Sequence, residues 1–408
     1  MAGSDRPVAT SSSSGGSVPS SVLLGVPRWT RDGGISAHVQ TSAAILARHG
    51  LDVRVLAARV ESPGDVPGVT VYRCPDLFNT GAPMGTRIGH ALAFGPEVIH
   101  LHQVDRPDVI QAMRTTAPVV LSAHVYSACS AGVHYFRPGQ ECTRAHGPGC
   151  IVSMLAHGCT HTHNPQAIPK RYKNASRRTA ALRSADLVIS YSSAVDRHLA
   201  ANGLARRRLI PFPATIHATL GSGHAARRRV VFAGRLVREK GVDILIRAAR
   251  EVDAEFVICG EGRLLEALRR LARRGGVESR VKFKGWLGPE QLAQELANAS
   301  VVVIPSLWPE PFGLVGIEAL AAGRPVIASA TGGIEDWLDD GVSGICVKPG
   351  DPHDLARALN LLLADPELQQ TMGMVGRQAV DARFSPDRHL AAVLEAYSDA
   401  RTGWRARP

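Results

Sequence analysis

The sequence has few aromatic residues and no long hydrophobic run, and each shortage excludes a class of protein. Phe, Trp and Tyr make up 5% of the 408 residues and no RNA- or DNA-binding motif occurs, so we expect no nucleic-acid partner. The longest apolar stretches, such as 301–304, are far too short to span a bilayer. Residues 1–20 are rich in Ser and Gly and have no apolar core of a secretory signal. We therefore expect a disordered tail at 1–20 and a cytoplasmic protein.

Acidic residues are the other shortage. The chain has 36 Asp and Glu against 47 Lys and Arg, a formal net charge of +11. This balance suits a phosphate-bearing partner, such as a sugar nucleotide or an anionic membrane surface. It is equally well explained by arginines that only solvate exposed helix faces. Charge alone therefore does not choose between a ligand and a solvated surface.

Short apolar runs alternate with helical patterns along almost the whole chain, which is typical of parallel sheets built from βαβ units. One series begins with a strand at 21–26, followed by a helix that starts at Gly33-Gly34. A second series begins with a strand at 230–233. Residues 211–229 lie between the two series, are rich in Pro, Gly and Arg, and are interpreted as a hinge.

These patterns predict an α/β protein with two tandem doubly wound, Rossmann-like domains that face each other across a cleft. We expect a first domain at 21–222 and a second domain at 223–385. A last helix within 386–408 has no strand after it and is expected to cross back onto the first domain. In such sheets, ligands bind at the carboxyl ends of the strands.

The most specific motif is 309–318, Pro-Glu-Pro-Phe-Gly-Leu-Val-Gly-Ile-Glu, which follows an apolar strand and opens a helix. Glu310 in the loop can accept hydrogen bonds from sugar hydroxyls, and Glu318, two helical turns along, can hold a ribose diol. The backbone amides of 312–314 stand at a helix N-terminus, where anions bind readily. A merely solvated Glu318 is the alternative, but it leaves the Gly-Leu turn and the apolar flanks unexplained.

A second motif, 234–241, follows directly after a strand. Arg235 and Lys240 are five positions apart in a glycine-flanked turn, and two such cations can clamp a diphosphate. The Gly-Glu-Gly turn at 260–262 is another place where the backbone can approach a ligand closely. Basic turns are common, so this motif alone is weak evidence for a diphosphate site. Its occurrence together with the glutamate motif makes the prediction stronger. Together they predict a nucleotide-diphosphate site in the second domain.

With these residues the chain resembles the retaining family 4 glycosyltransferases of glycosyltransferase group 1, which have the GT-B fold. The resemblance runs from about residue 21 and is strongest over 230–350, where Glu310 and Glu318 match the family's E-x7-E motif. It implies a hexosyltransferase-like enzyme that transfers sugar from a UDP-, GDP- or ADP-sugar donor. The implied acceptor is a glycan, a lipid-linked sugar or a small molecule, in polysaccharide or glycoconjugate biosynthesis.

The resemblance also implies roles for individual residues. Catalysis falls to Glu310 and to His124, which follows the apolar strand 119–122. The donor diphosphate would be bound by Arg235, Lys240, Gly33 and Gly34. The donor sugar would be bound by Phe312, Gly313 and Leu314, and the ribose by Glu318. The nucleobase would lie beside the loop of Gly285, Trp286 and Leu287. A satisfied structural histidine is the alternative for His124, and His102, which also follows a strand, is a weaker candidate.

We expect no cofactor, because the nucleotide sugar is a substrate. No Asp-x-Asp pair occurs, so a metal that holds the diphosphate is not indicated. Cations and helix N-termini would instead meet the charge of the leaving phosphate. No carboxylate pair is placed for double displacement, which favours direct attack with retention. Two positions depart from the family's usual pattern, both toward the acceptor: Val125 replaces an acidic residue, and residues 210–213 read Ile-Pro-Phe-Pro in place of an Asn-Gly turn.

Four of the seven cysteines fall within 31 residues directly after His124. They are Cys129, Cys142, Cys150 and Cys159. An ordered loop of free thiols, a tetrahedral zinc site and a redox-sensitive disulfide are all compatible with this spacing, although no close C-x2-C pair occurs. In each case we expect the loop to shape the acceptor pocket.

Other functions remain open on the sequence. A GT-B epimerase or a phosphorylase shares the architecture, although no clear lysine site for a phosphorylase cofactor occurs. A non-catalytic nucleotide-sugar-binding module is the alternative of a different class, and the complete set of Glu310, Glu318, Arg235 and Lys240 argues against it. The basic first domain is compatible with peripheral contact with an anionic inner membrane face.

Overall fold

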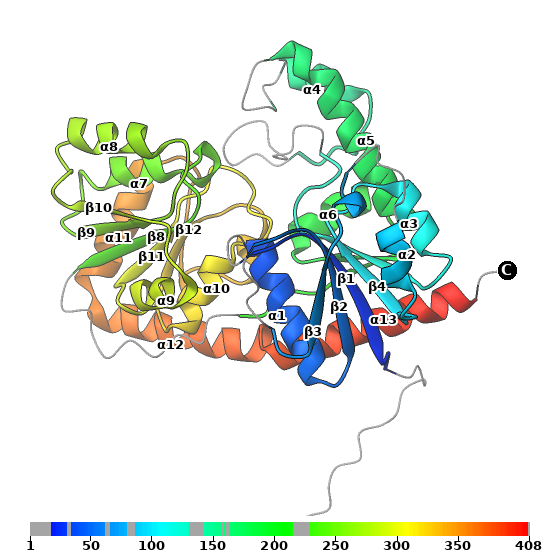
Figure 1. The fold of residues 1–408 in the computed structure, drawn as a ribbon. Coiled ribbons are helices and arrows are strands. Elements are labelled where there is room, and N and C mark those ends of the chain that lie inside the picture. The colour runs from blue at the N-terminus through cyan, green and yellow to red at the C-terminus, as the bar shows by residue number, and fades with distance from the viewer. Residues whose placement is uncertain are drawn as a thin grey trace, which may run out of the picture.

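The computed structural model describes residues 18–30, 34–61, 66–79, 86–129, 142–156, 159, 164–214 and 228–406. Two parallel sheets form two lobes, with helices packed around each sheet (Figure 1). The first sheet has seven strands in the order β3-β2-β1-β4-β5-β6-β7, and the second has six in the order β10-β9-β8-β11-β12-β13. Every pairing is parallel, which confirms the predicted class of two doubly wound α/β domains.

The strands of the first sheet are β1 (Ser21–Trp29), β2 (Asp52–Val60), β3 (Val69–Arg73), β4 (Val98–His102), β5 (Val119–Ala123), β6 (Leu187–Ser190) and β7 (Arg207–Leu209). The helices of this lobe are α1 (Gly34–Arg48), η1 (Pro75–Leu77), α2 (Thr86–Leu92), α3 (Pro107–Met113), α4 (Gly149–Ala156), η2 (Pro165–Ala167), α5 (Ile168–Ser184) and α6 (Ser193–Ala201).

The strands of the second sheet are β8 (Arg229–Ala233), β9 (Glu255–Cys259), β10 (Val281–Gly285), β11 (Val301–Ile304), β12 (Val326–Ser329) and β13 (Gly344–Val347). The helices that follow them are η3 (Arg238–Lys240), α7 (Val242–Ala248), α8 (Leu265–Arg274), α9 (Pro289–Ala297), α10 (Leu314–Ala321), η4 (Gly333–Asp336), α11 (Pro352–Ala364), α12 (Pro366–Arg383) and α13 (Pro386–Arg405).

The burial of a strand explains whether it could be recognised in the sequence. Every residue of β4, β5, β6, β11 and β12 is buried, so these strands are mainly apolar, as expected for central parallel strands, although β4 also contains His100 and His102. The strands β3, β7 and β13 were not singled out from the sequence. Each lies at an edge of its sheet and has partly exposed residues, so its pattern is diluted by polar side chains.

The last helix, α13, packs on α1, β5 and β6 of the first lobe and runs beneath it in Figure 1. The Ser385 hydroxyl caps it, Pro386 occupies its first turn, and Trp404 near its end donates a 2.8 Å hydrogen bond to the Arg114 carbonyl. These contacts support the return of 386–408 to the first domain, and the boundaries at 222 and 385 remain our proposal.

Within the described ranges, no helix is both long and apolar enough to cross a bilayer.

Candidate functional site

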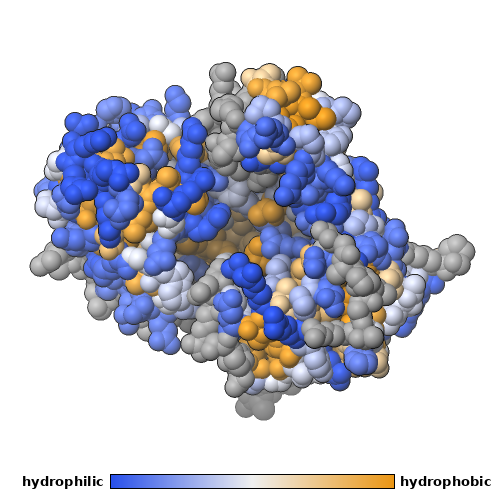
Figure 2. All heavy atoms as spheres, turned by 45° about the horizontal axis from the view of Figure 1, so that its top comes forward, coloured by the Kyte–Doolittle hydropathy of each residue, from blue (hydrophilic) through white to orange (hydrophobic). Residues whose placement is uncertain are grey.

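A cavity of about 600 Å³ lies between the lobes, and Figure 2 shows the hollow with hydrophobic residues on its floor. The first sheet reverses its strand order between β1 and β4, and the second between β8 and β11. Residues at or just beyond the carboxyl ends of these four strands line the cavity: Pro27, Arg28, Gln103, Ala233, Gly234, Ile304 and Ser306. Ligands of doubly wound sheets bind at such switch points, so the cavity is the candidate site.

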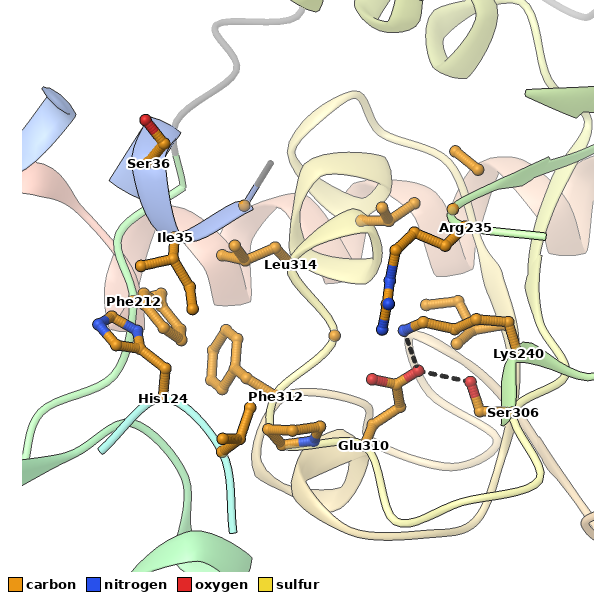
Figure 3. Close-up of a pocket in the computed structure, with 18 of the residues that line it drawn as sticks. Ile35, Ser36, His124, Phe212, Arg235, Lys240, Ser306, Glu310, Phe312 and Leu314 are labelled. Atoms are coloured by element: carbon orange, nitrogen blue, oxygen red, sulfur yellow. Dashed lines mark hydrogen bonds and ion pairs between the residues drawn. The ribbon is translucent and has the colours of Figure 1, made fainter. Parts of the chain in front are cut away.

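The second-lobe wall carries a buried carboxylate with two direct partners (Figure 3). Glu310 Oε1 accepts a 2.5 Å hydrogen bond from Lys240 Nζ and another of 2.5 Å from Ser306 Oγ. Burial opposes ionisation of Glu310, but the Lys240 ammonium and the Ser306 hydroxyl outweigh it and hold the pKa of this carboxyl below its ordinary value. Glu310 is therefore a carboxylate at neutral pH.

Backbone geometry places Lys240 beside this carboxylate. Gly241, the next residue, has φ of +64°, and a Cβ there would lie 1.8 Å from the Pro305 carbonyl oxygen. Leu307 N also donates a 2.8 Å hydrogen bond to the Glu239 carbonyl. The two loops thus pack closely because residue 241 is a glycine, and Lys240 and Glu310 meet although they are 70 positions apart.

The sugar-side loop ends at the start of α10. Gly313, its N-cap, has φ of +90°, and Phe312, Gly313 and Leu314 all line the cavity. The indole N–H of Trp337 donates a 2.6 Å hydrogen bond to the Phe312 carbonyl and fixes the loop from behind. The residues at the N-terminus of α10 therefore line the cavity, and the binding of a ligand by their amides remains a prediction.

The first-lobe wall is formed by the start of α1 and by the ends of β4 and β5. Gly34 and Ile35 line the cavity, and a Cβ at Gly34 would lie 3.7 Å from Leu314 Cδ1, so the two helix starts lie close together. Gly33, the other predicted glycine, lies outside the described residues.

His124 follows β5 and lines the cavity opposite Lys240 and Glu310 (Figure 3). Its ring stacks on that of Tyr191 with centroids 4.8 Å apart, and Tyr191 stacks on Phe212 at 4.0 Å. His124 Nε2 lies 2.9 Å from Nδ1 of His102. Burial lowers the pKa of His124 to about 3, so the ring is neutral at neutral pH.

Some predicted residues do not line this cavity. Glu318 is buried within α10, and Trp286 is half exposed beyond β10. Gly285 is nevertheless close by, because its carbonyl accepts a 2.6 Å hydrogen bond from Gly260 N, and a Cβ at Gly260 would lie 1.9 Å from the Gly234 oxygen. The turns after β8, β9 and β10 thus lie side by side. The ribose role of Glu318 and the nucleobase role of 285–287 remain predictions.

Several cavity residues were missed from the sequence. They are Arg28, Gln103, Ser306 and Trp308. Gln103 could have been found from the sequence, because it directly follows the apolar strand that ends at His102. In the structure its φ is +56°, which is unusual for a residue other than glycine. Phe212 and Val125, which belong to the two departures from the family pattern, also line the cavity.

The cysteine cluster is partly described. Burial raises the pKa of the Cys159 thiol to about 12, with further increases from Cys142, Cys129 and Cys150, which therefore lie nearby. Across the described ranges, no group of three or more His, Cys, Asp or Glu side chains is arranged to hold a metal ion. Cys142, Cys150 and Cys159 form no disulfide. The interpretations of this loop remain predictions.

The structure has two Rossmann-like lobes, and the cavity between them has Lys240 and Glu310 on one wall and His124 on the other. This arrangement is typical of GT-B proteins that use nucleotide sugars. Residues 223–379 match the family Glycosyl transferases group 1, and residues 33–215 match Glycosyl transferase 4-like domain. The chain belongs to the glycosyltransferase group 1 family. The family and the GT-B fold predicted from the sequence are therefore confirmed.

Individual relatives give a finer picture. D-inositol 3-phosphate glycosyltransferase of Corynebacterium jeikeium is 40% identical over 186 residues, which is 42% of this chain and 44% of that protein. Sucrose-phosphate synthase of Thermosynechococcus elongatus superposes with a TM-score of 0.69 at 24% identity, over 92% of this chain and 98% of that one. HepE of Anabaena, solved with UDP-glucose, gives 0.65 at 21% identity over the same shares. The two structures show the fold alone, and the match to the curated relative spans less than half its length.

Proposed function

We propose that this protein is a metal-independent, retaining hexosyltransferase that uses a nucleotide-sugar donor. The observation that carries the proposal is the cluster of Glu310, Lys240 and Ser306, which lies with Arg235 at a switch point and faces His124 across the cavity. Cations suit a diphosphate and a carboxylate suits sugar hydroxyls, so the two parts of a nucleotide sugar have partners a few ångströms apart.

Donor binding would rearrange this cluster. Lys240 is paired with Glu310 in this structure, and a diphosphate competes for its ammonium group. Glu310 has a second carboxylate oxygen, and release of Lys240 frees Oε1 as well for hydroxyls of the sugar. Arg235 and the N-termini of α1 and α10 would complete the diphosphate site, with Gly33 and Gly34 allowing close approach.

Retention is implied by the family resemblance, and the lining of the cavity supports direct attack rather than double displacement. Glu310 is the only carboxylate among its described lining residues, so no second carboxylate is available for a covalent intermediate. We infer that the acceptor hydroxyl oxygen bonds to the anomeric carbon on the face from which the phosphate oxygen departs. The bond to that phosphate oxygen breaks, and the phosphate takes the hydroxyl proton. Arg235 and Lys240 stabilise the negative charge that develops on the leaving group.

A panel of UDP-, GDP- and ADP-sugars, tested with chelator present and with lipid and glycan extracts as acceptors, examines this proposal. Nucleotide release from one donor above the others is the expected result. The UDP-glucose bound to HepE makes UDP-glucose the first donor to try. Nucleotide binding without turnover would favour the non-catalytic binding module, and absence of nucleotide binding would contradict the roles of Arg235, Lys240, Glu310 and Glu318.

Product stereochemistry separates retention from inversion. Proton NMR of the new glycosidic linkage should show the anomeric configuration of the donor, and an inverted product would exclude the front-face mechanism. The same sample tests the epimerase alternative, because an epimerase would change the sugar without forming a linkage.

We further propose that the first lobe contacts an anionic membrane through α4. This helix has no charged residue, and Ile151, Val152 and Leu155 are 36%, 61% and 56% exposed on it. Figure 2 shows the corresponding hydrophobic patch at the upper edge of the molecule. Between 142 and 185 the chain has no Asp or Glu, and its basic residues are Arg144, Lys170, Arg171, Lys173, Arg177, Arg178 and Arg183. An apolar face on a segment that is rich in basic residues matches an anionic lipid surface.

Sedimentation with phosphatidylglycerol and with phosphatidylcholine vesicles tests this contact. Wild-type protein should bind the anionic vesicles at low salt, and Val152→Ser with Leu155→Ser should weaken binding about tenfold or more. The matched control is Val342→Ser with Leu361→Ser, which removes similarly exposed side chains from the second lobe. Equal losses in the two double variants, or no sedimentation of the wild type, would contradict the proposal.

A further inference from the structure

A hydrogen-bonded group of histidines and tyrosines lies behind the first-lobe wall. His100 Nε2 is 2.7 Å from Ser122 Oγ, and its Nδ1 is 2.8 Å from the Tyr397 hydroxyl of α13. Ser122 Oγ is in turn 2.6 Å from the Tyr191 hydroxyl. The void beside these rings measures about 10 Å³, room for one water molecule at most. Close packing therefore holds the rings in fixed orientations.

His102 links this buried group to the cavity. Its Nδ1 lies 2.9 Å from Nε2 of His124, and both rings are almost completely buried. Burial lowers the pKa of both histidines far below 6.5, so at neutral pH each ring is neutral and carries one hydrogen. Only one of the two rings can donate the hydrogen bond that joins them.

The other nitrogen of His124 indicates which ring donates. His124 Nδ1 is buried and has no hydrogen-bond partner among the described residues. A buried N–H without a partner is rarer than an acceptor atom without one. A neutral imidazole also intrinsically prefers its hydrogen on Nε2. Both arguments place the hydrogen of His124 on Nε2, from which it is donated to Nδ1 of His102.

We propose that His102 is a positioning residue, which accepts the Nε2–H of His124 and so keeps Nδ1 of His124 as an acceptor for a hydroxyl group. The identity of that hydroxyl, on the donor sugar or on the acceptor, rests on the proposed function, whereas the position of the hydrogen does not. An acceptor atom selects a hydroxyl and disfavours a phosphate oxygen. This matches the placement of Arg235 and Lys240 on the opposite wall (Figure 3).

Nitrogen NMR of the full-length, ¹⁵N-histidine-labelled protein tests the position of the hydrogen without any substrate. The signals of His124 are identified by their loss in His124→Ala. We expect a protonated Nε2 in the wild type and in His102→Asn, whose amide oxygen replaces Nδ1 as the acceptor. We expect this single tautomer to be lost in His102→Leu and kept in His100→Asn, which alters the group without touching His124. A hydrogen on Nδ1 in the wild type would overturn the proposal.

Steady-state kinetics tests the consequence. His102→Leu should lower kcat about tenfold with little change in the donor KM, and His102→Asn should restore most of the rate. In a His124→Ala background the change of His102 to Leu should have no further effect. Equal losses in the Asn and Leu variants, both shown to be folded by thermal unfolding, would overturn the positioning role. If the wild type turns over no donor, the proposed function fails, and the NMR result still decides where the hydrogen lies.

Discussion

The two walls of the cavity handle buried titratable groups in opposite ways. On the second lobe, Glu310 is 2% exposed and keeps its charge, because Lys240 and Ser306 pair with it. On the first lobe, His124 is 5% exposed and lies among other buried histidines, and among the described residues no carboxylate forms a hydrogen bond with it, so it stays neutral. The comparison shows that burial alone does not set the charge of a site, because the partner supplied by the fold decides it.

This contrast suits a transfer between a charged and an uncharged partner. The wall with paired charges can exchange one ion pair for another when a diphosphate arrives. The neutral wall offers stacking faces and a single acceptor atom, which suit hydroxyl groups. We therefore expect substitutions on the second lobe to change nucleotide binding and substitutions on the first lobe to change the rate of transfer.

The largest expected effect is the loss of stability in acid, and it arises on the neutral wall. Burial lowers the pKa of His100 and His124 to about 3 and that of His389 to about 4. The unfolded chain therefore binds more protons than the folded chain from about pH 6.5 downward. Stability should fall as the pH drops through this window, by about 2 kcal/mol per histidine at pH 5. Urea unfolding at several pH values measures this loss.

His389→Asn sharpens the acid test. Its amide can still donate to the Pro211 carbonyl, which accepts from His389 Nδ1 at 2.8 Å, but it does not titrate. The pH dependence of unfolding should become shallower by about one proton. An unchanged slope in His389→Asn would mean that this ring titrates normally in the folded state.

The next effect concerns the charged wall. Glu310→Gln removes the charge that pairs with Lys240 but keeps the size of the side chain, and kcat/KM for transfer should fall about 100-fold or more. Glu290→Gln, an exposed position on α9, is the matched control and should behave as the wild type. Wild-type turnover by Glu310→Gln would remove this carboxylate from the reaction.

A smaller effect is expected from the cation beside it. Lys240→Ala should weaken nucleotide-diphosphate binding about tenfold, because one charge-assisted contact to the phosphates is lost. Calorimetry with UDP, GDP and ADP measures this change, and Lys282→Ala, on an exposed part of β10, is the control. Unchanged affinity in Lys240→Ala would mean that Lys240 serves only to stabilise Glu310.

The smallest effect should come from the predicted nucleobase side. The Trp286 side chain is about half exposed and does not line the cavity, so Trp286→Ala should change nucleotide affinity by no more than about threefold. Competition between UDP and its base-free analogue, ribose 5-diphosphate, separates contacts to the base from contacts to the phosphates. A tenfold loss confined to the nucleotide would instead place the base directly on this indole.

Much of the second-lobe wall could be predicted from the sequence, because its motifs are local. The motifs follow strands that can be recognised in the sequence as apolar runs. Their residues are Arg235, Lys240, Glu310 and 312–314. The sequence did not indicate that Lys240 and Glu310 pair with each other, or that Ser306 completes the pair. That arrangement depends on the close approach of two loops at Gly241, which no spacing along the chain reveals.

The first-lobe wall was largely hidden. The position of His124 after a strand and the family resemblance together predict its place in the site. For its hydrogen-bond partner, His102, the sequence gives only the weaker indication that it also follows a strand. The residues behind it come from α1, β4, β5 and α13, and their ring contacts join positions as far apart as His100 and Tyr397. In the sequence, such a histidine or tyrosine cannot be distinguished from an ordinary core residue.

The sequence by itself determined the two series of βαβ units, the turns that follow their strands and the motifs of the nucleotide side, because these depend on residues close together in the chain. Only the tertiary structure decided which side chains of the site are charged. It pairs Glu310 with Lys240, and it buries the histidines between the first sheet and α13. The physical reason is that a pKa and a tautomer are set by burial and by the atoms in contact, and the fold brings those atoms together from distant segments.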